Sequence, residues 1–182
     1  MSLFLGTITN KLDKKGRVSI PAPYRSLMAR LGVEELILRP YHLDPCVEGW
    51  PQSAFEQYSA DAQPADPFED PQDDLLLTLF SQAESIRPDS EGRVVLSEAL
   101  IAHANLTESV AFAGLGKKFQ IWEPSTLKER QAAAMKARQE KQRAREADAE
   151  VASVEERIAG FAAERSPLDD AFARAHTESD AA

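Results

Sequence analysis

Apolar and polar residues near the start of the chain follow the two-residue alternation of β-strands. Leu3 to Leu12 is rich in apolar and β-branched residues, and Arg17-Val18-Ser19-Ile20 alternates polar with apolar side chains. Asp13-Lys14-Lys15-Gly16 lies between them and has the composition of a tight turn, because Asp can accept hydrogen bonds from backbone amides ahead of it and Gly tolerates a positive φ. The pattern predicts a β-hairpin.

A helical pattern follows this hairpin. One apolar face is marked by residues at i, i+3, i+4 and i+7: Tyr24, Leu27, Met28 and Leu31. Gly32 is suited to end the helix, and Glu35 to Arg39 predicts a returning strand. We therefore expect a first module over residues 1–60.

The residues of the first turn recur later in the chain. Asp13 to Ile20 is matched by Asp89-Ser90-Glu91-Gly92-Arg93-Val94-Val95-Leu96, at an offset of 76 residues. The match continues from Leu31–Leu38 to Leu106–Phe112 with a one-residue gap, and from Trp50 to Trp122. Two copies of one module, related by a pseudo-two-fold repeat, are predicted, each with the order strand, turn, strand, helix, strand, turn, strand. In the second copy Ser97 is a candidate N-cap of the helix.

Composition separates the two modules from each other and from the C-terminal part of the chain. Residues 61–74 are acidic and rich in proline, which is typical of a linker, and helical segments flank them at Ser53–Tyr58 and Asp73–Ala83. The second module is expected over residues 75–127. A run of Ala, Lys, Arg, Gln and Glu, with Ser125 as its cap, predicts an exposed helix over residues 128–165, basic at first and then acidic. Residues 166–182 are small and acidic and predict a disordered tail. The predicted class is mainly β with short helices, an α+β fold.

The net charge of −9 argues at first sight against a nucleic-acid partner, because DNA affinity comes largely from Lys and Arg. The charge is unevenly distributed. Residues 61–74 contribute −6 and the chain from Glu146 onward contributes −7, so the remainder carries +4. Local clusters decide whether DNA can dock, and the cations of the remainder gather at a few turns and one helix.

Several other functions find no support in the sequence. No run approaches the ~20 apolar residues of a membrane span, and the first six residues are too short and uncharged for a signal peptide, so we expect a cytoplasmic protein. Cys46 is the single cysteine and is expected to be a buried apolar filler. Neither a catalytic Ser/His/Asp or Cys/His constellation nor a metal-ligand spacing is visible, so we predict no enzymatic activity, cofactor or metal. Gly114-Leu115-Gly116-Lys117-Lys118 lacks the spacing of a phosphate-binding loop and is interpreted as a hairpin turn.

The repeated Asp-x-x-Gly-Arg turn has both a structural and a functional interpretation. A hairpin tip commonly carries Asp, Gly and charged residues because it faces water. Repetition of the same spacing in both modules favours a shared structural role, such as an Asp–Arg pair across the turn. Arg17 and Arg93 are therefore either partners of Asp13 and Asp89 or direct DNA contacts.

Three segments together resemble the MraZ family, over roughly residues 1–130. They are Asn10-Lys11-Leu12-Asp13-Lys14-Lys15-Gly16-Arg17-Val18-Ser19-Ile20-Pro21, Asp89-Ser90-Glu91-Gly92-Arg93-Val94 and Gly114-Leu115-Gly116-Lys117-Lys118-Phe119-Gln120-Ile121-Trp122. The resemblance implies tandem AbrB/MazE-like modules of the double-split β-barrel type, assembled into a ring that is octameric or larger. It also implies a nucleoid-associated repressor of the bacterial division and cell-wall gene cluster, which binds direct repeats in its own promoter.

Basic side chains on a two-stranded ribbon can reach guanine edges or phosphates in the major groove. The first copy offers Lys11, Lys14, Lys15 and Arg17, whereas the second offers Arg87 and Arg93. We expect the first turn to be the DNA reader, with Arg93 as a further contact. Asp13, Gly16, Asp89 and Gly92 are expected to shape the two turns.

Other interpretations stay open for the C-terminal helix and for the protein as a whole. The basic residues between Lys128 and Arg145 form either a solvated helix face or a phosphate-contacting or self-inhibitory helix. A protein of this superfamily could also be antitoxin-like, with its tail wrapped around a toxin, or a purely structural ring. Toxin binding, or an absence of salt-dependent DNA affinity, would distinguish these alternatives from a DNA-binding regulator.

Overall fold

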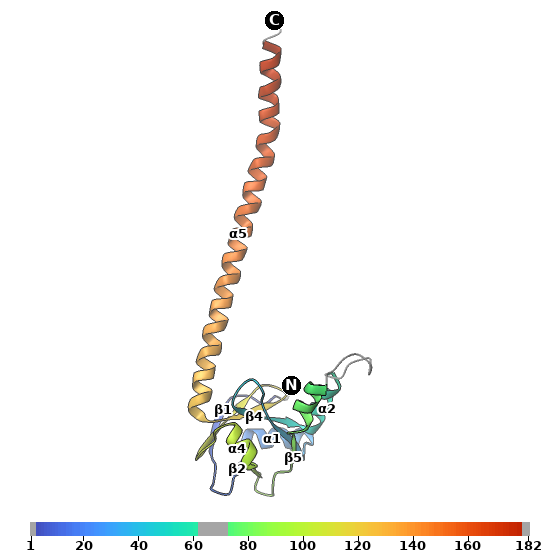
Figure 1. Ribbon diagram of the computed structural model, residues 1–182, viewed down its shortest axis with the longest axis vertical. Helices are drawn as coiled ribbons and strands as arrows, with labels where there is room; N and C mark the ends of the chain where they lie inside the picture. The colour runs from blue at the N-terminus through green and yellow to red at the C-terminus, as the bar shows by residue number, and fades with distance from the viewer. Residues whose placement is uncertain (1–2, 62–72, 180–182) are drawn as a thin grey trace. The chain divides into compact units, whose positions relative to one another are not determined.

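The computed structural model describes residues 3–61 and 73–179 of the chain (Figure 1). Contacts divide the chain into two compact units, residues 1–130 and 131–182. The first unit holds both sequence repeats, and the second belongs to one long helix. Most of the expected linker, residues 62–72, lies outside the described residues.

Both repeats form the same elements in the same order. The first repeat comprises β1 (Thr7–Lys11), β2 (Arg17–Ser19), α1 (Ala22–Leu31), β3 (Leu36–Pro40) and β4 (Cys46–Pro51). The second comprises β5 (Glu84–Ile86), β6 (Arg93–Val95), α4 (Glu98–His103), β7 (Ser109–Gly114) and β8 (Phe119–Trp122). The helices outside the repeats are α2 (Gln52–Asp61), α3 (Asp73–Phe80) and α5 (Pro124–Ser179). The predicted α+β class with a tandem repeat is confirmed.

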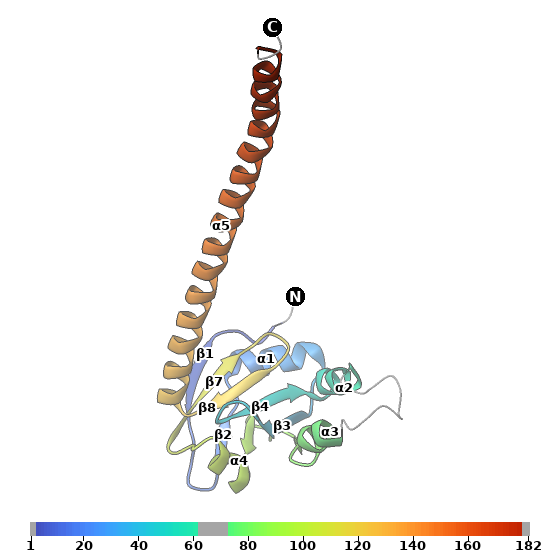
Figure 2. The ribbon, with the colours of Figure 1, turned by 45° about the horizontal axis from the view of Figure 1, so that its top comes forward.

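The two repeats exchange strands. A six-stranded antiparallel sheet has the order β1-β7-β8-β4-β3-β5, so the first strand of each repeat pairs with the third strand of the other (Figure 2). The second strands, β2 and β6, pair with each other in a separate two-stranded ladder, with Val18 opposite Val94. Both repeats therefore build one interlocked domain.

The prediction that the first two strands pair with each other in a hairpin is wrong. β1 pairs with β7 and β2 with β6. Between β1 and β2 the structure shows a Leu12–Val18 bridge and the Asp13 N to Arg17 O bond of 3.0 Å beside the turn, and a 2.6 Å bond from the Asn10 side-chain amide to the carbonyl of Ser19. Alternation along a sequence identifies a strand and its buried face, but it does not identify the strand that completes its hydrogen bonds. Here the other repeat supplies that strand. The hairpin predicted around Gly114–Lys118 is confirmed, because β7 pairs with β8 across it.

The main hydrophobic core lies between one face of the sheet, the β2–β6 ladder and helices α1 and α4. Val18 and Val94 from the ladder are buried. The expected inner face of α1 is buried at Tyr24, Leu27 and Met28, whereas Leu31 is 48% exposed. Burying one such apolar side chain stabilises the fold by about 1.5–3 kcal/mol.

The ends of the two short repeat helices follow the sequence signals. Gly32 ends α1 in the left-handed conformation, with φ of 65°, and its N–H donates to the carbonyl of Ala29. Ser97 is the N-cap of α4, and its hydroxyl accepts a hydrogen bond of 3.3 Å from the N–H of Leu100. Both predicted caps are confirmed.

Helix α5 begins one residue before its expected cap and extends beyond its expected end. The Glu123 carboxylate accepts hydrogen bonds from the hydroxyl of Ser125 and the N–H of Thr126, and these bonds lower the pKa of Glu123 to about 2. Glu123 therefore caps the helix, in place of Ser125. The helix continues to Ser179, past the position where a tail was expected. Among the described residues, none of the helices combines the length and the apolar character needed to cross a membrane.

A buried ionic cluster lies on the face of the sheet opposite the main core. Nη2 of Arg39 is 2.6 Å from Oε2 of Glu48, and these side chains are 1% and 0% exposed. Lys118 also contacts the Glu48 carboxylate, and its ammonium lies 4.7 Å from the ring centroid of Trp50. Two cations thus share one buried carboxylate, an arrangement that no sequence motif had indicated.

The Glu48→Gln variant is expected to lose roughly 3–5 kcal/mol of folding free energy, because Arg39 would remain buried without its counter-charge. The loss would be measured by urea unfolding of the full chain. A matched control is Glu34→Gln, which removes a carboxylate 3.9 Å from Arg87 in a pair that is 65% and 80% exposed, and which should change the free energy by less than about 0.5 kcal/mol. Equal stability of the Glu48 and Glu34 variants would contradict a structural role for the cluster.

Candidate nucleic-acid interface

The first turn, Asp13–Gly16, is organised around the carboxylate of Asp13. Oδ1 accepts hydrogen bonds of 2.9 Å from the backbone N–H groups of both Lys15 and Arg17, and Oδ2 accepts one of 2.7 Å from Nε of Arg17. The Gly16 N–H donates to the carbonyl of Asp13, and Gly16 has φ of 75°. A Cβ at this glycine would also lie 2.8 Å from the carbonyl oxygen of Leu96, so both conformation and space favour glycine here.

The second turn, Asp89–Gly92, repeats this geometry. Asp89 Oδ1 accepts hydrogen bonds of 2.9 Å from the backbone N–H groups of Glu91 and Arg93, and Oδ2 accepts one of 2.9 Å from Nε of Arg93. Gly92 has φ of 76° and donates its N–H to the carbonyl of Asp89. The Asp–Arg pair expected across each turn is therefore present in both.

The β2–β6 ladder positions the two turns relative to each other. The carbonyl of Gly16 accepts a 2.8 Å hydrogen bond from the N–H of Leu96, and the carbonyl of Gly92 accepts a 2.9 Å bond from the N–H of Ile20. Each turn is thus anchored on the other repeat, and the two turns lie at opposite ends of the short antiparallel ladder. Both turns project from the same end of the domain in Figure 1. The tips are supported by the interlocked core and do not extend from it as free ribbons.

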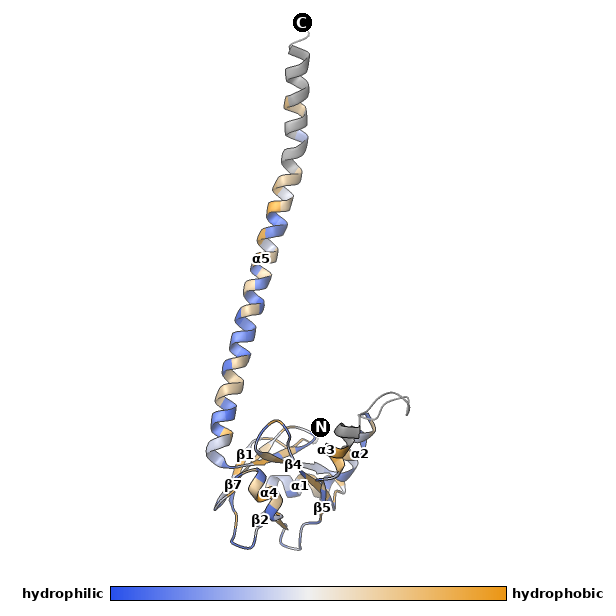
Figure 3. Ribbon diagram, in the orientation of Figure 1, coloured by the Kyte–Doolittle hydropathy of each residue, from blue (hydrophilic) through white to orange (hydrophobic). Residues whose placement is uncertain are grey.

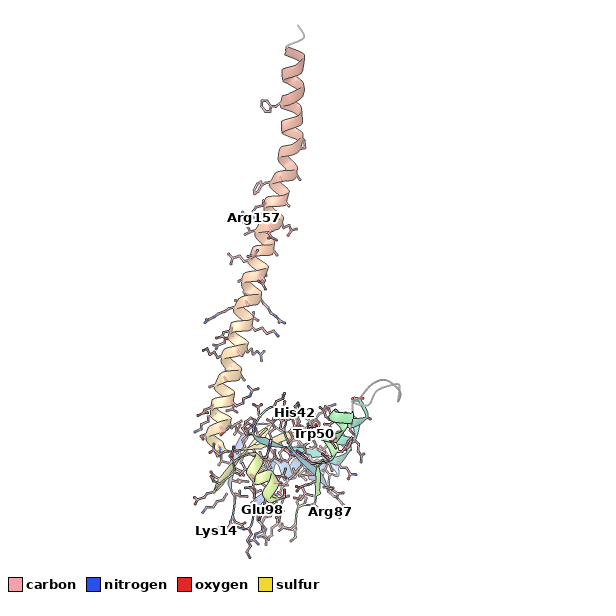
Figure 4. The ribbon with its side chains drawn as sticks, in the orientation of Figure 1. Lys14, His42, Trp50, Arg87, Glu98 and Arg157 are labelled. Atoms are coloured by element: carbon pink, nitrogen blue, oxygen red, sulfur yellow. The ribbon has the colours of Figure 1, made fainter. Side chains whose placement is uncertain are left out.

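The first turn carries cations that have no carboxylate partner. Lys11, Lys14 and Lys15 are exposed, and among the described residues none of them forms an ion pair. Figure 4 shows Lys14 at the outer end of the loop. Arg17 uses Nε for Asp13, and within the described part of the chain its two Nη atoms have no hydrogen-bond partner. Four cations against one carboxylate give this tip a positive surplus.

The second turn has the same backbone but a different charge. Arg93 is held by two carboxylates, because its Nη1 lies 2.8 Å from Oε2 of Glu91 in addition to the bond from Nε to Asp89. Ser90 occupies the position that corresponds to Lys14. The two acidic residues of this turn therefore balance Arg87 and Arg93, the cations that the sequence had assigned to it.

Arg25 is a further cation at the second turn that the sequence analysis did not identify. It belongs to α1 of the first repeat, and its Nη1 donates a 3.3 Å hydrogen bond to the carbonyl of Glu91. Its side chain fills the space beside Gly92, where a Cβ would approach to 2.2 Å. The strand exchange brings α1 against a turn 66 residues away in the sequence, so no local pattern could indicate this contact.

This architecture, with two interlocked repeats whose second strands pair and whose Asp-x-x-Gly-Arg turns share one end of the domain, defines a tandem-repeat α+β protein. The sequence profile described as "MraZ protein, putative antitoxin-like" matches residues 3–78 and again residues 79–149. The chain belongs to the MraZ family.

Relatives from three bacteria agree with this assignment. A protein of Gluconacetobacter diazotrophicus is 48% identical over 137 residues, which are 74% of this chain and 87% of the relative. Proteins of Gluconobacter oxydans, with 47% identity over 74% of this chain and 84% of the relative, and of Xanthobacter autotrophicus, with 42% over 70% and 82%, also match. All three carry the name "Transcriptional regulator MraZ", and none of these names denotes an enzyme, in agreement with the non-enzymatic prediction.

The turn geometry predicts that the pKa of the Asp13 carboxyl group is lowered, which a titration can measure. Hydrogen bonds from the Arg17 backbone N–H and guanidinium lower the pKa of Asp13 below its ordinary value of 3.8, and Asp89 is lowered in the same way by Arg93. A depressed carboxyl pKa contributes stability that is present above pH 3.8 and is lost as the pH falls through the folded-state pKa. In a carboxyl ¹³C NMR titration, Arg17→Ala should raise the Asp13 midpoint and leave that of Asp89 in place. An unmoved Asp13 midpoint would contradict the pairing.

Proposed function

We propose that this chain is a sequence-specific DNA-binding transcriptional regulator whose first turn is the principal DNA contact. The observation that carries the proposal is the exposed, unpaired cationic tip of that turn, formed by Lys11, Lys14, Lys15 and Arg17. Phosphates and guanine O6 and N7 are the groups that such side chains bind in the major groove. The names of the relatives, which are transcriptional regulators, support the same function.

Arg17 can serve both the turn and the DNA. Its Nε bonds Asp13 and holds the guanidinium in a fixed plane, while the Nη atoms stay available for an acceptor outside the protein. A guanidinium fixed in this way loses less side-chain freedom on binding, which favours affinity. The two roles that the sequence left as alternatives are therefore compatible. Arg93 is engaged by two carboxylates, and we assign it a weaker contact.

The proposed target genes, location and binding site rest on the resemblance between the sequence and the MraZ family. We infer a repressor of the division and cell-wall gene cluster that acts in the cytoplasm at the nucleoid and binds direct repeats in its own promoter. A single turn offers few contacts, so useful affinity requires several turns to bind at once. A ring of copies, octameric or larger, supplies them, because linked sites raise the effective concentration steeply.

A second candidate function is binding of a toxin, since the family description includes the term "antitoxin-like". The exposed helix α5 would then be the segment that contacts the toxin. This function requires a toxin gene beside the gene for this chain, and a stable complex of the two purified products. The cationic first turn has no role in such a complex, so DNA binding is the better supported function.

The Lys14→Glu/Lys15→Glu variant is expected to bind DNA from the chain's own upstream region at least roughly tenfold more weakly, since a lost base or phosphate contact costs about 1–3 kcal/mol. Fluorescence anisotropy across a salt series would measure the affinity. The slope of log affinity against log salt should also fall by about two units, because two phosphate contacts are lost.

A matched control is Lys117→Glu/Lys128→Glu, which makes the same charge change at two exposed lysines away from both turns. This control should keep most of the affinity and the salt slope. A larger loss in the control than in the turn variant would place the DNA contact at Lys117 or Lys128 and not at the first turn. Unchanged binding in the turn variant would overturn the assignment of the first turn.

The proposed ring predicts a mass several times that of one 20.1 kDa chain. Light scattering coupled to gel filtration, at the protein concentration of the binding assay, would measure it. A truncation of the DNA to one direct repeat should then weaken binding far more than a change of sequence between the repeats. A monomeric mass at that concentration would contradict the multivalent mechanism.

A further inference from the structure

Beyond Arg130, the described side chains of helix α5 include an exposed apolar face. Every described side chain from 131 onward is exposed, including large apolar residues that soluble helices usually bury, such as Ile158 at 61% and Phe161 at 62%. Figure 3 shows hydrophobic residues recurring among hydrophilic ones along this part of α5. Most of the stability of helices in proteins comes from packing of an apolar face, so we expect this exposed face to bind a partner.

The apolar residues follow a seven-residue repeat, the spacing of a coiled coil. Positions spaced alternately by four and three residues form one seam: Ala133, Ala137, Glu140, Ala144, Ala147, Val151, Val154, Ile158, Phe161, Arg165, Leu168 and Phe172. Strict heptads sustained over several repeats impose a supercoil between two helices. The seam therefore indicates a helical partner and not a flat surface.

The seam is asymmetric along its length. Its first half contains only alanines and one glutamate, and its second half contains the large side chains. A parallel pair in register would place alanine against alanine, as at Ala144 and Ala147, and would bury Glu140 against its own copy. Gaps between small residues and like charges within a core both destabilise packing.

In an antiparallel pair, the alanine-rich half of each helix lies against the half of the other helix that contains the large side chains. With Val151 opposite Val154 of the second copy, Ala147 lies opposite Ile158 and Ala144 lies opposite Phe161. The same register sets Ala133 opposite Phe172. Each large side chain then meets a small one, which is the complementarity that a dense helix interface requires.

The charges beside the seam repel less in this register than in a parallel pair. In this register Glu150 lies beside Arg157 of the second copy, and the reciprocal pair forms on the other side of the centre. The same register sets Asp148 near Glu155 of the second copy, and because this pair is also reciprocal, its two unfavourable contacts offset the two favourable ones. In a parallel pair Glu150 would instead lie beside Glu155, a repulsive contact. The basic stretch 136–145 would also face its own like-charged copy in the parallel pair.

We propose that α5 is a self-association element, and that residues 133–172 pair with the same segment of a second copy in an antiparallel coiled coil. This inference does not depend on DNA binding. Neighbours in a ring of eight or more copies differ by a rotation far smaller than 180°, so they cannot supply antiparallel helices to each other. In the proposed ring, α5 would therefore join copies from two different rings.

Cysteine cross-linking of the full chain tests the pairing. Ala144→Cys and Phe161→Cys proteins, prepared separately and mixed under mild oxidation, should form a disulfide-linked dimer that contains one chain of each kind. Each variant alone should form little dimer, because like positions lie about 17 residues, or about 25 Å, apart in the antiparallel register. The native Cys46 is buried and will not interfere.

Ala149→Cys is the matched control, since it is an exposed alanine on the opposite face of the same helix. Mixed with Phe161→Cys, it should give only the background level of dimer. Efficient dimer formation by Ala144→Cys alone would establish a parallel pair, and background levels in every mixture would establish an unpaired helix. Either result would overturn the proposal.

A charge exchange gives an independent test that leaves the apolar seam intact. Glu150→Arg should reduce cross-linking in the Ala144/Phe161 mixture several-fold, because it opposes Arg157 of the second copy. Adding Arg157→Glu to both proteins should restore the yield, since the pair is re-formed with its charges exchanged. An increase in the dimer formed by Ala144→Cys alone, caused by Glu150→Arg, would indicate relief of the Glu150–Glu155 repulsion and hence the parallel orientation.

Discussion

The pairing of β2 with β6 is the interaction on which the remainder of the domain depends. Val18 and Val94 lie opposite each other in this ladder and are buried in the common core, and the ladder also carries the hydrogen bonds that anchor Gly16 and Gly92. Neither repeat can close this core alone, because each lends its first strand to the sheet of the other. The domain is therefore a single cooperative unit built from contacts distant in sequence, a topology that folds more slowly than one made of local hairpins.

The same pairing explains why the DNA contact is proposed on a turn so small. A four-residue tip on a free two-stranded ribbon would be mobile, since an isolated hairpin is only marginally stable in water. Here both turns are bonded to the opposite repeat, and the carboxylates of Asp13 and Asp89 each accept two backbone N–H groups. The backbone is thus fixed before any ligand arrives. What the turn offers to a ligand then depends only on its side chains.

Most local structure could be predicted from the sequence, because local signals determine it. The Asp-x-x-Gly-Arg turns, the glycine that ends α1 and the serine that begins α4 all depend on residues within a few positions of each other. The strand partners could not be predicted, since alternation does not distinguish a neighbour in sequence from a strand of the other repeat. Arg25 at the second turn and the Arg39–Glu48–Lys118 cluster were missed for the same reason, as their partners come together only through the exchanged strands and the sheet register.

Fusion of the two repeats in one chain permits differences that two identical copies could not have. Glu48 and Gln120 are paired across the centre of the sheet, and they bond the indole N–H of Trp50 and Trp122 respectively, so the backbone arrangement is symmetric while one side chain is charged. The turns differ in the same way, since the lysines of the first form no ion pair among the described residues, whereas Arg93 of the second is paired with two carboxylates. In an assembly of identical chains, cationic tips therefore recur once per chain although Asp-x-x-Gly-Arg turns recur twice. The spacing between DNA contacts would then be set by the distance between whole chains and not by the distance between repeats.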